Sequence, residues 1–367
     1  MELIPEWAPN IHPMIVHFPI ALFMLAIIMD VAGYFLPDSW WDEKKNLILY
    51  GISGIAGIGT YFSGKEAADS VFIEAEAQNL LTEHADFAEY TVWFIGLYAL
   101  LRIGIFVWDK SDIKPVRVGM TLLSFAGAVL LFQTSDRGAQ MVYQYGVGVQ
   151  KAEIENATKD TPVSDHNETG EVSGGSSAES AGTFIETENG NWEWEIEENA
   201  VSDLKNNFHW LEGSLEGLNA EAVKTTSGSY ALSFSGNDLN GFFTSHESYN
   251  KVQVDYYIDI SAFDGNVMLT NNVIDESNFD FVSIASDGTV QQGRIANGEE
   301  EIFEEGTTDV SKSMFVRVVG NGTHFRGYVD KEMIVHGHGD APKAGGVGLK
   351  VSGSGTVVLE KMSLTKL

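Results

Sequence analysis

The sequence predicts a multi-domain membrane protein, with an all-α bundle of four transmembrane helices followed by a linker and an all-β jelly-roll sandwich. Four long apolar runs with almost no internal charge occupy the first 150 residues. A stretch dominated by Ser, Gly, Glu and Thr follows, which holds too little apolar surface to fold. The remainder alternates apolar and polar residues between short turns, as β-sandwiches do. We therefore expect domains at 1–150, 151–182 and 183–367.

Composition excludes some classes of partner and site. The formal net charge of −30 argues against nucleic acid as a partner, because nucleic-acid binding requires a basic footprint. The 367 residues include no cysteine, which excludes disulfides, thiolate ligands, iron–sulfur clusters and c-type haem attachment. The expected partners are thus the lipid bilayer, subunits of a membrane complex and glycans.

The four apolar runs cover residues 14–36, 47–63, 86–108 and 116–134, each close to the ~20 residues that cross a bilayer. Basic residues concentrate in the loops after the first and third runs, namely Lys44, Lys45, Lys110, Lys114 and Arg117. The positive-inside rule assigns those loops to the cytoplasm. It therefore predicts a bacterial inner-membrane protein whose N-terminus, loop 64–85 and C-terminal domain lie on the extracytoplasmic side. Residues 1–13 contain no Lys or Arg, so we expect an uncleaved first span.

Two charges lie inside the spans. Asp30 falls about sixteen residues into the first run and Arg102 about sixteen into the third. Both runs are expected to cross in the same direction, so the two charges should lie at the same depth. An intramembrane charge is costly unless it is paired. We therefore predict an Asp30–Arg102 ion pair with a structural role.

The stretch at 12–22 places two histidines and two prolines at the start of the first run. Pro19 removes the hydrogen bond to the carbonyl of Ile15 and should interrupt the helix near His17. His12, His17 and His84 are all expected near the outer face. Neutral imidazoles that project into a helix bundle are the usual axial ligands of b-type haem. We predict His17 and His84 as ligands of the haem iron, with His12 as a cofactor-binding neighbour.

Two alternatives to haem remain open for these histidines. A His/Glu site could hold Zn, Mn or Fe, with Glu89 or Glu76 as the carboxylate ligand. The imidazoles could instead satisfy backbone carbonyls that the prolines leave without donors, with no cofactor at all.

Two patterns in the C-terminal domain suggest chemistry. Glu193, Glu195 and Glu197 would share one strand face, as paired carboxylates of sandwich glycosidases do, although a solvated strand face is the favoured interpretation. His336, His338 and Asp340 have a spacing that a metal ion could use. A polar glycine-rich turn is the favoured interpretation of that second pattern.

Both ends of the first domain carry a recognisable signature. The stretch 12–22 (His-Pro-Met-Ile-Val-His-Phe-Pro-Ile-Ala-Leu), with Asp30 after it, resembles the start of the bacterial membrane family called domain of unknown function 2231. The segment 138–149 (Gly-Ala-Gln-Met-Val-Tyr-Gln-Tyr-Gly-Val-Gly-Val) resembles its end. The resemblance covers about residues 10–150 and implies a four-span bundle, sometimes found beside redox modules. His84 matches a family histidine, whereas Tyr145 stands where the family commonly has one.

The C-terminal domain resembles concanavalin-A-like and laminin-G-like jelly rolls. Segments 345–351 and 356–360 are similar to their closing strands, and the segment 328–332 is similar to the side-chain "handle" that precedes them. This resemblance implies the fold and leaves the ligand open.

The leading hypothesis is an integral membrane subunit that binds haem b near the outer face and belongs to a respiratory or other redox complex, with the sandwich docking partner subunits. It would be an electron-transfer or accessory subunit and not a stand-alone enzyme. The alternative is a cofactor-free membrane scaffold whose sandwich binds glycan or a partner protein.

Overall fold

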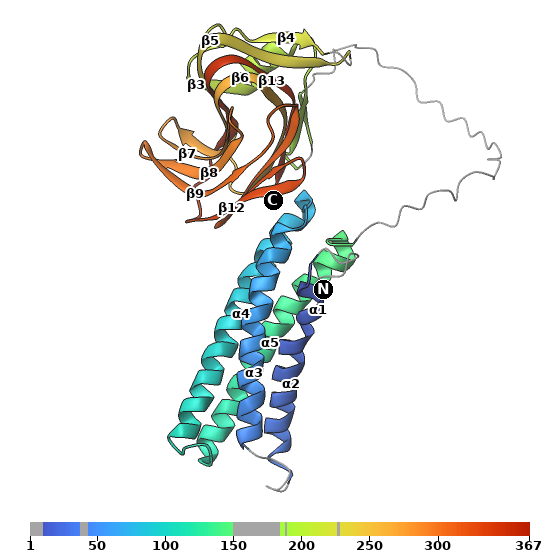
Figure 1. The fold of residues 1–367 in the computed structure, drawn as a ribbon, viewed down its shortest axis with the longest axis vertical. Coiled ribbons are helices and arrows are strands. Elements are labelled where there is room, and N and C mark those ends of the chain that lie inside the picture. Colours follow the sequence, from blue (N-terminus) through green and yellow to red (C-terminus); the bar gives the residue numbers. More distant parts are fainter. Residues whose placement is uncertain (1–9, 37–42, 150–183, 188, 226–227) are drawn as a thin grey trace, which may run out of the picture.

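The computed structural model describes residues 10–36, 43–149, 184–187, 189–225 and 228–367. The linker expected at 151–182 lies outside the described residues. Within them, an N-terminal helical bundle is followed by a large antiparallel β-sandwich, as the sequence predicts (Figure 1).

The bundle contains α1 (His12–Ile15), α2 (His17–Ala32), α3 (Glu43–Asp69), α4 (Ala75–Val107) and α5 (Lys114–Tyr145). With α1 and α2 taken together, these make four helices that are long and apolar enough to cross a membrane. They lie side by side in Figure 1. Their outward surfaces carry large apolar side chains, such as Ile55, Phe132 and Leu100, each more than 60% exposed. Such a surface suits lipid contact.

The interruption between α1 and α2 falls at Val16, immediately after Ile15. Pro19 has no N–H for the Ile15 carbonyl, which explains why the first helix stops there. The carbonyl of Pro19 itself accepts a hydrogen bond from Ser53 Oγ at 3.1 Å. The break therefore lies where the sequence places it.

The loop expected at 64–85 is mostly helical. α3 continues to Asp69, and α4 begins at Ala75, so the residues that precede the third span form one continuous helix with it. Helix-forming Ala, Leu, Glu and Gln dominate the first turns of α4, and no Gly or Pro interrupts them before Gly96. The ends of α3 and α4 therefore project as a hairpin. We call residues 69–86 the hairpin tip.

The sandwich contains one short helix and thirteen strands. They are β1 (Phe184–Glu186), β2 (Trp192–Glu195), α6 (Ala200–Asn207), β3 (Phe208–Glu212), β4 (Glu221–Lys224), β5 (Tyr230–Ser245), β6 (Val252–Asp275), β7 (Asn278–Ala285), β8 (Thr289–Ala296), β9 (Glu299–Thr307), β10 (Met314–Asn321), β11 (His324–Val329), β12 (Glu332–His338) and β13 (Gly346–Lys366).

Strands β6 and β13 are long enough to take part in both layers. One layer has the order β1-β2-β13-β6-β10-β11-β12, and the other continues from β6 and β13 through β5, β7, β8 and β9. Between the layers lies an apolar core that includes Trp194, Phe243 and Tyr256. The two closing strands expected from the sequence are one strand, β13, whose register shifts between Gly353 and Gly355. Both glycines have positive φ, which a residue with a side chain would adopt only under strain.

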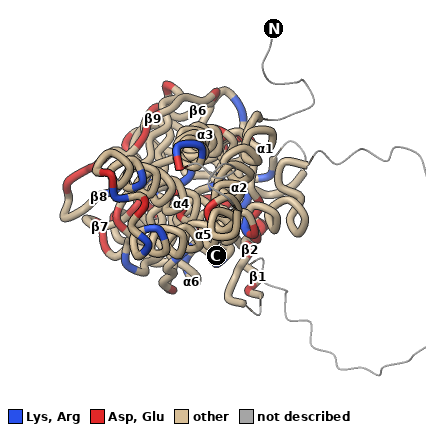
Figure 2. Tube along the Cα trace, turned by 90° about the horizontal axis from the view of Figure 1, so that it is seen from below, with Lys and Arg blue, Asp and Glu red and all other residues tan. Residues whose placement is uncertain are grey.

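The sandwich lies at the end of the bundle where α3 meets α4 (Figure 1). The outer face of the β10–β11–β12 layer packs on the hairpin tip, with the Phe72 ring 5.4 Å from that of Tyr328. The opposite end of the bundle carries the basic residues of the expected cytoplasmic loops. Figure 2 views the molecule from that end and shows lysines in blue beside an acidic residue in red at the near end of α3.

Candidate functional site

The contact between sandwich and bundle buries polar side chains that alternate along β10 and β11. Arg326, only 1% exposed, donates to Gln78 Oε1 at 3.1 Å and to Thr82 Oγ1 at 3.3 Å. Asn321 donates to the Gln78 carbonyl at 3.3 Å and to Thr82 Oγ1 at 3.2 Å. Burial lowers the pKa of the Arg326 guanidinium. The α4 groups thus accept hydrogen bonds from both Nη atoms of the buried cation, whereas its Nε has no partner among the described residues.

A second arginine extends this contact. Arg317 binds both oxygens of Asp255 at 2.8 Å and donates to the carbonyl of Ile73 at 2.8 Å. Its guanidinium lies 4.3 Å from the centre of the Phe72 ring, and Glu74 is a further partner at 3.3 Å. Because these partners come from both domains, Arg317 fixes the angle at which the sandwich is seated on the bundle.

Three histidines gather beside these arginines. His324 on β11 is paired with His338 on β12, and His336 lies two residues earlier on the same face. One ring nitrogen from each lies within 4.8 Å of the others. Burial and the nearby Arg326 lower the pKa of His324 to about 4, so this imidazole is neutral at neutral pH. Of the residues predicted at 336–340, the structure brings the two histidines together, whereas Asp340 is exposed.

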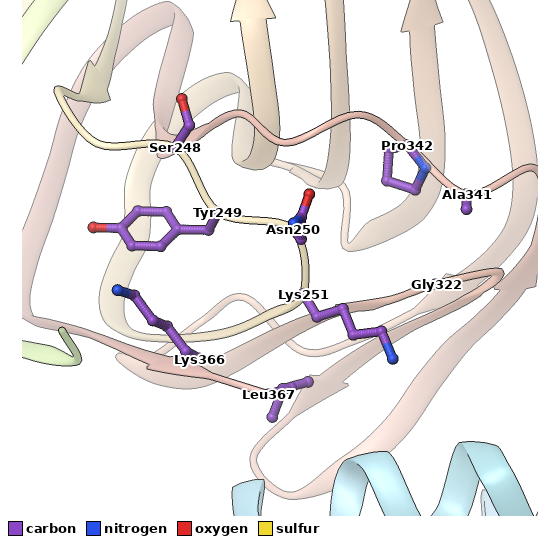
Figure 3. Close-up of a pocket in the computed structure, with 9 residues that line it drawn as sticks. All are labelled: Ser248, Tyr249, Asn250, Lys251, Gly322, Ala341, Pro342, Lys366 and Leu367. Carbon is purple, nitrogen blue, oxygen red and sulfur yellow. The ribbon is translucent and has the colours of Figure 1, made fainter. Parts of the chain in front are cut away.

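An open cavity lies at the edge of the sandwich, close to the bundle (Figure 3). It has a volume of about 630 Å³. It is lined by Ser248, Tyr249, Asn250, Lys251, Gly322, Ala341, Pro342, Lys366 and Leu367. Lys251 reaches Asn79 of α4 at 3.4 Å, and Lys366 lies 5.4 Å from the Tyr249 ring centre. Neither lysine forms a salt bridge with any residue in the described part of the chain. The lining combines two lysines with hydroxyl, amide and apolar groups.

In the bundle, the structure places His12 and His84 in matching environments. His12 Nδ1 lies 3.2 Å from the carbonyl of Thr60, and its ring packs against Gly64. His84 Nδ1 lies 2.9 Å from the carbonyl of Thr134, and its ring packs against Gly138. In each case a carbonyl fixes Nδ1 as the donor and leaves Nε2 as the acceptor.

The other residues proposed for a bundle cofactor are placed differently. His17 is exposed on the surface of α2, and Glu76 and Glu89 are exposed on α4. Among the described residues, the only group of three or more potential metal ligands is the histidine cluster of the sandwich. The structure therefore favours His12 over His17 as the neighbour of His84, and it does not assemble a carboxylate site around these histidines.

The structure places Asp30 beside Arg102 inside the bundle, toward its end away from the sandwich. Arg102 Nη1 lies 2.5 Å from Asp30 Oδ2, and the two side chains are 4% and 1% exposed. Asp30 also accepts from Tyr50 at 2.9 Å and from Asn46, while Glu43 lies 3.0 Å from Arg102. Hydrogen bonds and opposite charges together satisfy both buried groups, which is the condition for a stable buried pair.

The glutamates of β2 form a surface ion cluster. Lys361 binds both Glu193 and, at 2.6 Å, Glu195. The hydrogen bond from Lys361 lowers the pKa of Glu193, whereas a general acid of a glycosidase needs a raised pKa. Glu197 lies beyond the end of the strand. This arrangement favours the solvated strand face.

Sequence reasoning missed the repeat that underlies the bundle. Eighteen residues separate His12 from Asp30, and eighteen separate His84 from Arg102. The partner helices repeat as well, since Thr60 precedes Gly64 and Thr134 precedes Gly138 by the same four residues. This self-similarity was the available signal. His324, by contrast, lies on a different strand from His336, and only strand pairing joins them.

Comparison with known proteins finds a family model for the N-terminal domain and solved structures similar to the sandwich. A family model described as a predicted membrane protein (DUF2231) matches residues 8–151, which confirms the resemblance of the N-terminal domain. No curated protein matches the chain. Among solved structures, a carbohydrate-binding module, CBM66, from Bacillus subtilis is 18% identical, with a TM-score of 0.36, and the match covers 44% of this chain and 96% of that one.

Two further solved structures match the same region. A protein of unknown function with a galectin-like fold from Bacillus subtilis is 11% identical, with a TM-score of 0.36 and coverage of 47% of this chain and 94% of that one. A Bacillus licheniformis beta-glucanase is 13% identical, with a TM-score of 0.33 and coverage of 44% and 92%. These similarities concern the fold of the sandwich and do not identify its ligand.

Proposed function

We propose that the protein is a membrane-anchored binding protein, in which the bundle holds the sandwich in a fixed orientation at the extracytoplasmic surface of a bacterial inner membrane. The observation that carries this proposal is the buried polar contact of Arg326, Arg317 and Asn321 with the hairpin tip. The buried guanidinium groups are removed from water where the two domains meet, so the hairpin-tip groups that replace water as their hydrogen-bond partners hold the sandwich in one orientation. A linker alone would tether the domain, whereas this contact sets its orientation.

The orientation follows from the ends of the helices. Lys44 and Lys45 lie in the first turn of α3, and Lys114 begins α5, all at the end of the bundle away from the sandwich. Basic loops favour the cytoplasmic side. The sandwich then lies outside, where glycans are accessible.

The cavity in Figure 3 is the binding site that we propose. Its volume of about 630 Å³ suits a small ligand. Hydroxyl, amide and ammonium groups from Ser248, Asn250, Lys251 and Lys366 line it, and they match the hydroxyl and carboxylate groups of an acidic saccharide. The ligand class is therefore a glycan that carries negative charge.

A binding experiment on the full chain tests this proposal. The protein in lipid nanodiscs is titrated with uronic-acid-containing and neutral oligosaccharides by calorimetry. We expect saturable binding of the acidic set, weakened at least roughly tenfold by Lys251→Gln with Lys366→Gln, since each lost charge-assisted hydrogen bond is worth ~1.5–3 kcal/mol. Lys312→Gln, an exposed lysine elsewhere on the sandwich, is the matched control. Equal binding of the double variant would overturn the proposed site.

The second candidate is the haem-bearing redox subunit. One observation favours it: His12 and His84 each engage Nδ1 with a helix carbonyl and leave Nε2 for a ligand, as metal-bound histidines do. If haem b binds, these two imidazoles would hold it, and haem would supply one-electron transfer. A reduced-minus-oxidised optical spectrum of the purified protein tests this. A b-type α-band that is lost in His84→Ala and retained in His17→Ala would support it, and a flat spectrum would overturn it.

A further inference from the structure

The histidine cluster of the sandwich has features that the binding role does not use. His324, His336 and His338 project from β11 and β12 toward the hairpin tip, where Asp69 and Asp86 lie. The ring centres of His324 and His338 are 4.7 Å apart, and those of His336 and His338 are 4.8 Å apart. Three imidazoles from one sheet face thus meet two carboxylates from the bundle.

Each of two imidazoles uses one nitrogen on a carboxylate and leaves the other without a partner. His336 Nδ1 lies 2.8 Å from Asp69, and His324 Nε2 lies 3.4 Å from Asp86. The remaining nitrogens, His336 Nε2 and His324 Nδ1, are buried and have no hydrogen-bond partner among the described residues. A buried polar atom without a partner costs free energy. A carboxylate on one ring nitrogen is also the arrangement that directs the lone pair of the other to a metal ion.

The chemistry of the group selects the kind of ion. Because the other nitrogen of each ring lies on a carboxylate, His324 Nδ1 and His336 Nε2 are the nitrogens that can coordinate an ion. Neutral imidazole sets bind zinc and its neighbours among the transition metals, whereas calcium and magnesium require oxygen ligands. A zinc–nitrogen bond of about 2.0–2.1 Å requires the three nitrogens, which lie within 4.8 Å of one another, to converge, and the exposed His338 is the side chain that can move toward the other two.

We propose that His324, His336 and His338 bind one zinc-class ion between the sandwich and the bundle, with Asp69 and Asp86 orienting two of the imidazoles. The ion would compensate the two unpartnered nitrogens and tie β11 and β12 to the hairpin tip through those carboxylates. Metal binding would then stabilise the docked arrangement. This site is separate from the cavity of the proposed glycan site and stands or falls independently of it.

The experiment uses the full chain, purified in detergent without a polyhistidine tag and stripped with chelator. Zinc titration by calorimetry should give one tight site per chain, and cobalt substitution should give the visible bands of a nitrogen-ligated ion. His336→Gln with His338→Gln should weaken zinc binding by roughly 100-fold or more, and Asp69→Asn, at an exposed helix end, by roughly tenfold. Zinc should also slow amide hydrogen exchange in β11, β12 and the hairpin tip.

The matched control removes two other histidines of the sandwich. His209 and His246 stack at 5.2 Å, away from the cluster, so His209→Gln with His246→Gln should leave the zinc affinity unchanged. Absence of a saturable site, or equal affinity in the cluster and control variants, would overturn the proposal. Asp69→Asn keeps the test valid if the double variant folds poorly, because that side chain is half exposed and contacts the cluster only through His336.

Discussion

The two helical hairpins of the bundle share a histidine–glycine contact and a charged residue at the same spacing, but the two charges differ in sign. In the first, α1 to α3, His12 packs on Gly64 near one end and Asp30 lies toward the other; in the second, α4 and α5, His84 packs on Gly138 and Arg102 takes the place of Asp30. The equivalent histidines make the same contacts, whereas the equivalent charged residues are opposite in sign. A repeat of identical charges would repel at this depth, so the change in sign is what allows the two halves to associate.

The hairpins also differ at the end near the sandwich. α4 begins nine residues before His84, and those extra turns contact the sandwich through Gln78 and Thr82. α1 begins at His12 itself. The second hairpin therefore has two tasks, packing in the membrane and carrying the extramembrane domain, and substitutions can separate them.

Of the expected effects, the loss of unfolding free energy on removal of Arg102 should be the largest. Arg102→Met leaves the Asp30 carboxylate, 1% exposed, with only Tyr50 and Asn46 as partners. Loss of one member of a buried ion pair costs about 3–5 kcal/mol. Thermal unfolding in detergent should show this loss. Asp30→Asn should lower the unfolding free energy less, because Arg102 keeps its ion pair with Glu43. The double variant Asp30→Leu with Arg102→Met should recover much of the lost stability. Equal stability of the wild type and Arg102→Met would contradict the pairing.

Substitution in the extra turns of α4 should undock the sandwich without unfolding the bundle. Gln78→Leu removes the acceptor at 3.1 Å from Arg326 and leaves a buried guanidinium with Thr82 alone. A hydrogen bond to a charged group is worth about 1.5–3 kcal/mol. Hydrogen exchange in β10 and β11 should become faster by the factor that this free energy predicts. Exchange in α2 should not change. Gln140→Leu, on the exposed face of α5, is the control and should alter neither.

The two hairpins also differ in how much space surrounds equivalent positions inside the bundle. Gly127 and Ser53 occupy equivalent positions, eleven residues before the packing glycines. A Cβ at Gly127 would lie 2.6 Å from Phe23 and 2.7 Å from Phe94, whereas Ser53 has room to bond Pro19. Overpacking typically costs about 1–3 kcal/mol, so Gly127→Ala should lower the unfolding free energy by that amount. Gly119→Ala, with open space around it, should not.

The spans and the strands could be predicted from the sequence, whereas the contact between the two domains could not. Hydropathy predicts the spans because a helix that crosses the bilayer is apolar along most of its length. Alternation predicts the strands because successive side chains of a strand point to opposite faces of the sheet. The depths of Asp30 and Arg102 follow from counting residues along each span. The contact of Arg326 with Gln78 cannot be found in this way, because it depends on how two folded domains meet. The two residues are 248 positions apart in the sequence. The zinc-class site we propose depends on the same docking, and so does the role of Asp69.

The smallest expected loss of stability concerns the histidine–glycine contact that both hairpins share. His12→Ala and His84→Ala each remove a ring that packs on a glycine and bonds a threonine carbonyl. Hydrogen bonds between membrane helices average below about 1 kcal/mol, so with the lost packing each substitution should cost about 1–2 kcal/mol in detergent unfolding, and the two costs should be similar. Because the two imidazoles have separate hydrogen-bond partners, the Thr60 and Thr134 carbonyls, their effects should add if they share no ligand. Strong non-additivity would instead show that the two imidazoles share a ligand, which is the outcome that the haem proposal requires.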